Sequence, residues 1–185
     1  MKFQAFVVKT NGLLHELPTD VWITPPTLGA PGSENRPATR KLRAVWDTGA
    51  SVSVINVGVA HDFDLVQTGI QSVSTANGTY DAATYMCDLY LPNPAIMPDI
   101  EVAEANLGPD LDMLIGMDVI SRGDFAVTNL NDETWFTFRL PSIQRANFIN
   151  GPNPEHKCPC GSVKKYKNCC GPLANHALQN AFKKP

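Results

Sequence analysis

Short runs in which apolar and polar residues alternate dominate the first 140 positions of the chain. The clearest is Trp135–Leu140, where Phe136, Phe138 and Leu140 alternate with polar neighbours at the period of a half-buried strand. Further runs rich in strand-forming residues are Phe3–Val8, Val21–Thr24, Leu42–Trp46 and Asp81–Leu91. One short helix is predicted at Met117–Ser121. The pattern therefore predicts an all-β body.

Two turn signals divide these runs. Asn77-Gly78 is a residue pair typical of a two-residue hairpin turn. The flanking segments, Ile70–Ala76 and Thr79–Asp88, are predicted to be the arms of that hairpin. Pro25–Pro37 contains four prolines and two glycines and is predicted to be a surface loop.

Composition and charge change after residue 140. Pro141–Lys157 is rich in proline, glycine and asparagine, which is the composition of a linker. Residues 1–150 hold nine Lys and Arg against 17 Asp and Glu, whereas residues 151–185 hold six Lys against one acidic residue. An acidic body with a basic tail indicates two modules with different partners. We predict a domain at 1–140, a linker at 141–157, a small module at 158–171 and a C-terminal tail at 172–185.

One acidic residue stands where a preorganised site is expected. Asp47 follows the apolar run Leu42–Trp46 and is followed by Thr48 and Gly49. A carboxylate at the end of a rigid strand is held in place for chemistry, and the glycine amide can approach it closely. A second apolar run ends at Gly116 and leads into the predicted helix, where a glycine permits close backbone packing.

Asp47-Thr48-Gly49-Ala50, together with the later Leu114-Ile115-Gly116, resembles the retropepsin-like aspartic proteases. The resemblance covers about residues 1–140 and implies a closed β-barrel with a flap hairpin. It implies that Asp47 is the catalytic aspartate, that Thr48 bonds across a dimer interface and that Gly49 holds the turn. The flap that covers the substrate would contain Asn77, Gly78 and Thr79.

An aspartic protease needs two carboxylates, one to activate water and one to polarise the scissile carbonyl. The chain has a single Asp-Thr-Gly and no Asp-Ser-Gly. We therefore predict a symmetric homodimer with paired Asp47 residues on the two-fold axis. The predicted function is aspartic endopeptidase cleavage of peptide or protein substrates, with no cofactor for catalysis.

Four of the five cysteines lie close together near the C-terminus. Cys158, Cys160, Cys169 and Cys170 form the pattern C-x-C-x8-C-C, and four thiolates suffice for a closed tetrahedral Zn2+ site. The alternatives are disulfides or a redox site, although a disulfide between adjacent cysteines would be strained. We predict structural zinc. The fifth cysteine, Cys87, is expected to be an ordinary core or flap thiol.

Residues 158–171 are similar to the SEC-C motif in their cysteine spacing, in Gly161-Ser162, in Lys164-Lys165-Tyr166-Lys167 and in Gly171. Val163 departs from the pattern. Because members of this family use the module for protein and ribosome contacts, the resemblance implies a ribosome, a chaperone or another protein as partner. A basic face that serves only as a stable cap is the simpler interpretation.

The rival to the protease hypothesis is a binding protein: a catalytically idle retropepsin fold that acts as a dimeric adaptor and is recruited through its zinc tail. Turnover distinguishes the two. No apolar run approaches the roughly 20 residues that a membrane-spanning helix needs. The first ten residues lack the regions of a signal peptide, so we expect a cytoplasmic protein without membrane contact.

Overall fold

The computed structural model describes residues 4–26, 40–75, 78–93, 95–143, 153–158 and 162–171. The chain divides into two compact units, residues 1–144 and residues 145–185. The elements of the first unit are β1 (Gln4–Asn11), β2 (Pro18–Thr24), β3 (Leu42–Trp46), β4 (Ser53–Asn56), α1 (Val59–Asp62), β5 (Gln67–Thr75), β6 (Gly78–Tyr90), β7 (Ile96–Ala105), β8 (Met113–Ile115), α2 (Met117–Ile120), β9 (Asp124–Leu130) and β10 (Glu133–Leu140). The second unit contains the single-turn η1 (Tyr166–Asn168).

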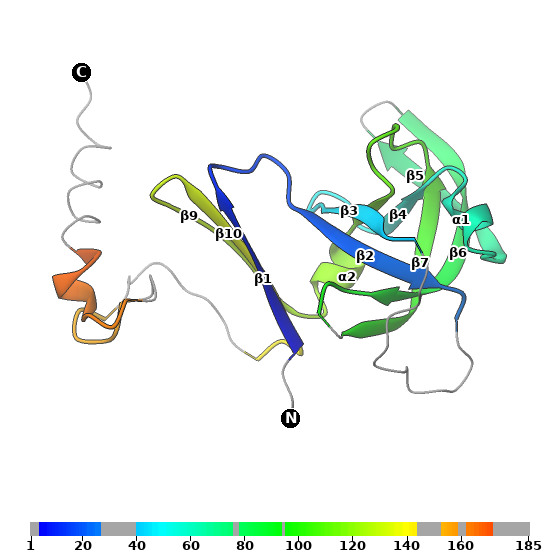
Figure 1. Cartoon of the computed structure of the whole chain (residues 1–185). Helices are drawn as coiled ribbons and strands as arrows, with labels where there is room; N and C mark the ends of the chain where they lie inside the picture. Colours follow the sequence, from blue (N-terminus) through cyan, green and yellow to red (C-terminus); the bar gives the residue numbers. More distant parts are fainter. Residues whose placement is uncertain are drawn as a thin grey trace, which may run out of the picture. The chain divides into compact units, whose positions relative to one another are not determined.

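Six strands form a closed barrel (Figure 1). The sheet runs β2-β3-β8-β4-β7-β6-β5, and a further pairing of β2 with β6 closes it on itself. The pairs β3–β8 and β4–β7 are parallel, and the other neighbours are antiparallel. Closure leaves β5 as the edge strand, paired with β6 in a long hairpin. The all-β barrel with a hairpin, expected from the resemblance, is confirmed.

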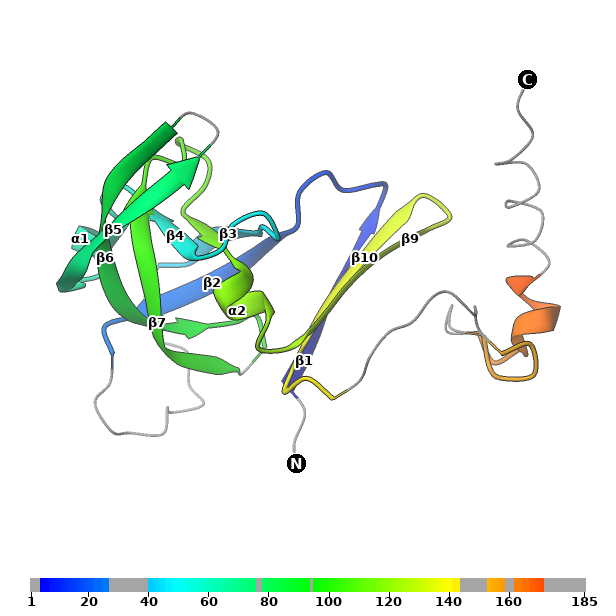
Figure 2. The same ribbon diagram turned by 180° about the vertical axis from the view of Figure 1, so that it is seen from behind.

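A second, three-stranded sheet lies beside the barrel in the order β1-β10-β9, and it is seen from the other side in Figure 2. All its pairs are antiparallel. The alternation noted in the last strand points Phe136 and Phe138 inward, where both are fully buried. The ring of Trp46 lies 4.7 Å from that of Phe138 and 5.3 Å from that of Phe136. The small sheet is thus fastened to the barrel through the residue that precedes Asp47.

Most predicted strands are present, and the structure adds several that the pattern did not indicate. The hairpin arms and the helix after Gly116 are observed. The strands β4, β7 and β9 and the helix α1 were not predicted. The predicted loop Pro25–Pro37 falls largely outside the described residues. No helix in the described segments is both long and apolar enough to cross a membrane.

Cys87 lies in the barrel core with no exposed surface. Burial, with a smaller contribution from the charges of Asp88 and Asp118, raises the pKa of the Cys87 thiol to about 12. The thiol is therefore protonated at neutral pH and unreactive. The expectation of an ordinary core residue is confirmed.

The second unit begins before its first cysteine. Within the described part of the tail, Tyr166 N donates to His156 O at 2.9 Å and Lys167 N donates to Pro154 O at 3.1 Å. Glu155 accepts from Lys165 at 2.9 Å and from Lys167 at 2.6 Å. These two lysines, Lys167 first, lower the pKa of the Glu155 carboxyl. The predicted domain boundaries remain predictions.

A charged contact holds the end of the first unit. Asp124, the first residue of β9, accepts from Ser142 Oγ at 2.6 Å, Ile143 N at 3.0 Å and Arg139 Nε at 3.1 Å. These partners, Ser142 first, hold the pKa of Asp124 well below its usual range. A carboxyl whose pKa falls on folding stabilises the fold above its unfolded pKa, about 3.9, and that contribution is lost as pH falls through the folded pKa.

We predict that Asp124→Asn lowers the urea midpoint of the full chain at neutral pH, and that its difference from wild type shrinks as pH falls below about 4. The matched control is Asp132→Asn in the β9–β10 turn, where the positive φ of 60° suits asparagine. Unfolding is followed at fixed protein concentration. A difference that stays constant down to pH 3 (about one unit below the unfolded pKa) would contradict the role given to the Asp124 carboxylate.

Candidate active site

Asp47 stands in a turn that backbone hydrogen bonds hold at both ends. Asp47 N donates to Ile115 O at 2.9 Å, and Met117 N donates to Ala50 O at 2.8 Å. The turn that follows β3 is therefore fixed to the segment between β8 and α2. Gly49 N donates to Asp47 Oδ1 at 2.8 Å, and this fixes the orientation of the carboxylate. A Cβ at Gly49 would lie 3.1 Å from the same oxygen, closer than an ordinary contact, so a side chain there would crowd the carboxylate.

Gly116 permits the close packing beneath this turn. A Cβ at Gly116 would lie 2.6 Å from both the carbonyl carbon and the carbonyl oxygen of Val52. Gly116 N donates to Ser53 Oγ at 3.1 Å, and Ser53 Oγ donates to Asp118 Oδ1 at 2.9 Å. Ser53 is fully buried. The two predicted motifs thus meet in space, with Asp118 in a supporting position.

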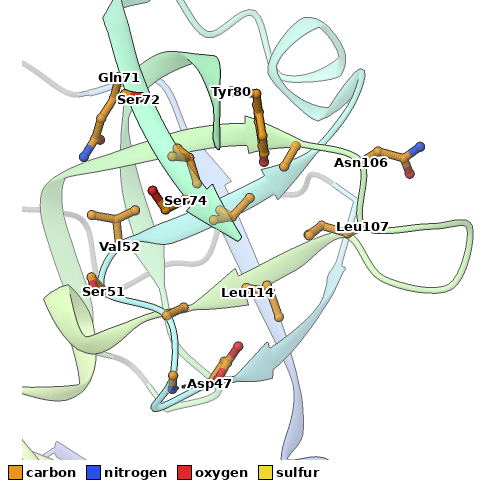
Figure 3. A pocket seen from close by; sticks show the side chains of 15 residues that line it. Asp47, Ser51, Val52, Gln71, Ser72, Ser74, Tyr80, Asn106, Leu107 and Leu114 are labelled. Atoms are coloured by element: carbon orange, nitrogen blue, oxygen red, sulfur yellow. Dashed lines mark hydrogen bonds between the residues drawn. The ribbon is translucent and has the colours of Figure 1, made fainter. Parts of the chain in front are cut away.

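A cleft of about 580 Å3 opens beside Asp47 (Figure 3). Asp47 lies at one end, and Ser72 and Ser74 of the β5–β6 hairpin lie across the cleft from it. The residues that line it are Asp47, Gly49, Ala50, Ser51, Val52, Val54, Gln71, Ser72, Val73, Ser74, Tyr80, Ala105, Asn106, Leu107 and Leu114. The Asp47 turn, the hairpin and the segment after β7 therefore enclose one cavity.

The predicted site residues take different positions around this cleft. Asp47 is half-buried and faces it, while Thr48 and Gly49 are exposed on the turn. Gly78 and Thr79 are exposed at the start of β6, and Thr79 Oγ1 lies 3.1 Å from Ser74 Oγ. Asn77 lies outside the described residues. The assignment of these residues as catalytic and flap residues remains a prediction.

Several cleft residues were not found from the sequence. Val52, Tyr80 and Leu107 belong to three different segments and share no local spacing. The alternation of β6 could have assigned Tyr80 to one face of the hairpin, but it could not show which face the barrel would turn toward Asp47.

The cysteine cluster has the geometry that a metal site needs. The sulfurs of Cys158, Cys169 and Cys170 all lie within 4.8 Å of one another, whereas Cys160 is outside the described residues. Cys169 Sγ and Cys170 Sγ are 3.9 Å apart, too far for a disulfide. Zn–S bonds of about 2.3 Å in a tetrahedron place sulfurs about 3.8 Å apart, so the three thiols fit zinc.

Comparisons with known proteins agree with both motifs. Residues 35–119 match the family model described as aspartyl protease, and residues 157–172 match the model described as SEC-C motif. Residues 35–119 are thus similar to aspartyl proteases and residues 157–172 to the SEC-C motif, and the two resemblances seen in the sequence are confirmed. No curated protein sequence matches the chain significantly.

Among solved structures, a retropepsin-like aspartic protease from Rickettsia conorii is 13% identical, with a TM-score of 0.47. The match covers 75% of this chain and 96% of that one. EIAV protease in complex with the inhibitor HBY-793 is 15% identical, with a TM-score of 0.43 and coverages of 60% and 91%. The retroviral protease-like domain of Ddi1 from Leishmania major is 17% identical, with a TM-score of 0.42 and coverages of 67% and 95%.

We predict that Gly116→Ala disturbs the turn without unfolding the barrel. The new methyl group meets backbone atoms of Val52, which cannot rotate away, so the turn that carries Asp47 must shift. The expected cost is about 1–3 kcal/mol in urea unfolding. The control is Gly69→Ala in β5, where no positive φ is needed and a Cβ would meet only a side-chain atom, Thr84 Oγ1 at 3.1 Å. Equal stability of Gly116→Ala and wild type would contradict the close packing described here.

We predict that the full chain binds one Zn2+ through four thiolates. Cobalt substitution should give thiolate-to-metal absorption bands, and Cys170→Ser should lose them together with bound zinc. Cys87→Ala removes a cysteine from the barrel core and should retain the metal. Because metal binding supplies folding free energy to such a small unit, a chelator should unfold residues 153–171 and leave the barrel intact. Free thiols at all four positions of zinc-supplied protein would contradict the site.

Proposed function

We propose that this chain is a cytoplasmic aspartic endopeptidase that works as a homodimer. The main observation behind the proposal is the Asp47 carboxylate, which Gly49 N fixes beside a cleft of about 580 Å3. Cleavage needs a water between two carboxylates, one ionised as general base and one protonated to polarise the scissile carbonyl. Attack of the water on that carbonyl gives a tetrahedral intermediate, and its collapse releases an amine and a carboxylic acid.

The second carboxylate comes from a second copy. Each chain has one Asp-Thr-Gly, and Thr48 and Gly49 are exposed on the turn, where another subunit can reach them. A two-fold axis beside the turn brings the two Asp47 side chains together and joins two half-clefts into one. Thr48 then bonds across the interface. The paired-carboxylate mechanism uses no metal, so a zinc ion held by the cysteines of the tail would be structural.

An extended peptide suits the shape and chemistry of this cleft. Its floor carries apolar groups from Val52, Val54 and Leu114. The hairpin on the other side offers the polar groups of Gln71, Ser72 and Ser74 and lies at the edge of its sheet. Peptides commonly bind by backbone hydrogen bonds at a sheet edge, while pockets select alternate side chains.

We predict that Asp47→Asn lowers the hydrolysis of a diverse peptide library by roughly 10²- to 10⁴-fold, the usual contribution of a general base, while the dimer stays folded. Cleavage is measured at roughly pH 4 to 8, above the pKa of an ordinary aspartate. The control is Asp64→Asn, an exposed residue whose φ of 54° suits asparagine.

Two outcomes would count against the proposal. Undiminished cleavage by purified Asp47→Asn would remove Asp47 from catalysis. A folded wild-type dimer that cleaves no peptide would favour the adaptor, and capture of ribosomes or chaperones through the zinc tail would then be the next measurement. Sedimentation supplies the state of assembly, and a monomer at every concentration would remove the paired-carboxylate mechanism.

A further inference from the structure

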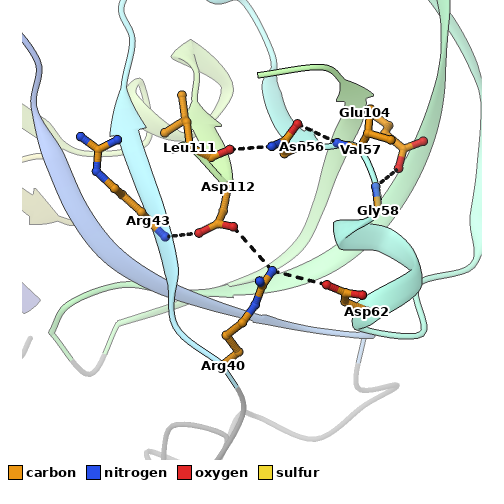
Figure 4. A network of polar contacts seen from close by, with 9 residues as sticks. All are labelled: Arg40, Arg43, Asn56, Val57, Gly58, Asp62, Glu104, Leu111 and Asp112. Atoms are coloured by element: carbon orange, nitrogen blue, oxygen red, sulfur yellow. Dashed lines mark hydrogen bonds and ion pairs between the residues drawn. The ribbon is translucent and has the colours of Figure 1, made fainter. Parts of the chain in front are cut away.

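The side chain of Asn56 makes four hydrogen bonds from the end of β4, although Asn56 is not among the residues that line the cleft. Its amide nitrogen donates to Gly108 O at 2.6 Å and to Leu111 O at 2.9 Å. Its amide oxygen accepts from Leu107 N and Val57 N, each at 2.9 Å. Figure 4 shows the side chain directed toward Leu111 and Val57.

No side chain other than that of asparagine can make all four of these hydrogen bonds at this position. An amide has two N–H donors and an oxygen with two lone pairs, and all four are used here. The pattern also fixes the orientation of the amide, because the opposite orientation would place N–H groups against N–H groups. Aspartate, the isosteric replacement, would keep both acceptor contacts and set a carboxylate oxygen against the carbonyls of Gly108 and Leu111.

The segment that Asn56 holds forms one wall of the cleft. Residues 106–112 connect β7 to β8, and Asn106 and Leu107 line the cavity. The left-handed turn at Gly108, with φ 84°, brings the segment back toward Asn56. At its far end, Asp112 Oδ2 accepts from Arg43 N at 2.8 Å, and Figure 4 shows this second anchor. The stretch that contains Leu107 thus depends on Asn56, and its end depends on Asp112.

The chemistry of the wall indicates what it selects. Leu107 completes an apolar surface with Val52, Val54 and Leu114. Among the described residues that line the cleft, Asp47 alone has a charged side chain. Each CH2 group of a ligand that is buried on such a surface strengthens binding about four-fold, so the surface favours aliphatic side chains over small or charged ones. Movement of Leu107 away from this position would weaken the preference of the cleft for aliphatic side chains.

We propose that Asn56 is a positioning residue for substrate selectivity. It fixes Leu107 as a wall of the cleft and so directs cleavage to peptides with a branched aliphatic side chain beside the scissile bond. The inference rests on the proposed function. The turn that carries Asp47 is held by Ile115, Met117 and Gly49 and by no contact of the Asn56 side chain, so substrate binding and chemistry are separable.

The test compares wild type with Asn56→Asp in the full, zinc-loaded chain. The matched control is Asn129→Asp, which makes the same chemical change in the small sheet, where Asn129 Oδ1 accepts from Thr134 Oγ1. The substrates are peptides that differ only in one side chain beside the scissile bond: alanine, valine, leucine or lysine. We expect KM for the leucine peptide to rise about ten-fold in Asn56→Asp, as for the loss of two hydrogen bonds, with kcat within about two-fold. The ratio of kcat/KM for the leucine peptide to kcat/KM for the alanine peptide should fall as this KM rises.

A second variant acts on the wall directly. Leu107→Ala removes the side chain that Asn56 positions and should cause the same loss of preference. The double variant should lose little more than either single one, because both changes act through one surface. Additive losses would overturn the proposal, and so would full leucine selectivity in Leu107→Ala.

Hydrogen exchange gives a readout that needs no catalysis. Amides of residues 106–112 should exchange faster in Asn56→Asp than in wild type or Asn129→Asp, while amides of β8 should not change. Unchanged exchange at 106–112 overturns the positioning role whether or not the protein is a protease. Faster exchange with unaltered selectivity overturns the link to substrate choice. If wild type cleaves nothing, the proposed function fails, and binding of the same peptides to wild type and Asn56→Asp decides the inference.

Discussion

The structure depends on the close approach of two backbone segments beneath the Asp47 turn. Gly116 packs against the carbonyl of Val52 at a distance that leaves no room for a Cβ atom. This contact lets Ile115 O and Met117 N bond to the two ends of the turn. The proposed function requires the Asp47 carboxylate to share a proton with its symmetry mate, and such a site needs its position fixed to a fraction of an ångström. Backbone hydrogen bonds can provide this, because they do not depend on rotamers.

Aromatic packing in the core fixes the strand that leads to Asp47. Trp46 directly precedes Asp47, and its indole N–H donates to the buried Thr19 at 2.9 Å. The same ring packs against Phe136 and Phe138 of the small sheet and stacks on Phe125 at 6.0 Å. Aromatic contacts of this kind contribute about 0.5–1.5 kcal/mol each beyond burial. The second sheet therefore supports β3, the strand that ends just before Asp47.

The parts that the sequence could predict are those with a local signal. The strand at Trp135–Leu140 has one buried face, and the Asn-Gly pair marked the hairpin, so both were foreseen. β4 was missed because three of its four residues are buried in a row and show no alternation. β7 was missed because a proline and charged residues interrupt its apolar pattern. Asp47 and the cysteines had motifs, whereas Asn56 and Leu107 acquire their roles from contacts made about 50 residues apart.

The two walls of the cleft are held in different ways, and this separates two tasks. The β5–β6 hairpin lies at the edge of the sheet, and its tip extends beyond the pairing of β6 with β7. Elements with few buried contacts open at low free-energy cost, so this wall can move. The opposite wall is fixed by Asn56 and Asp112 to two strands of the closed barrel. A moving wall cannot discriminate between side chains that differ by one or two methyl groups, because it adjusts to each of them. Selectivity therefore belongs to the wall that does not move.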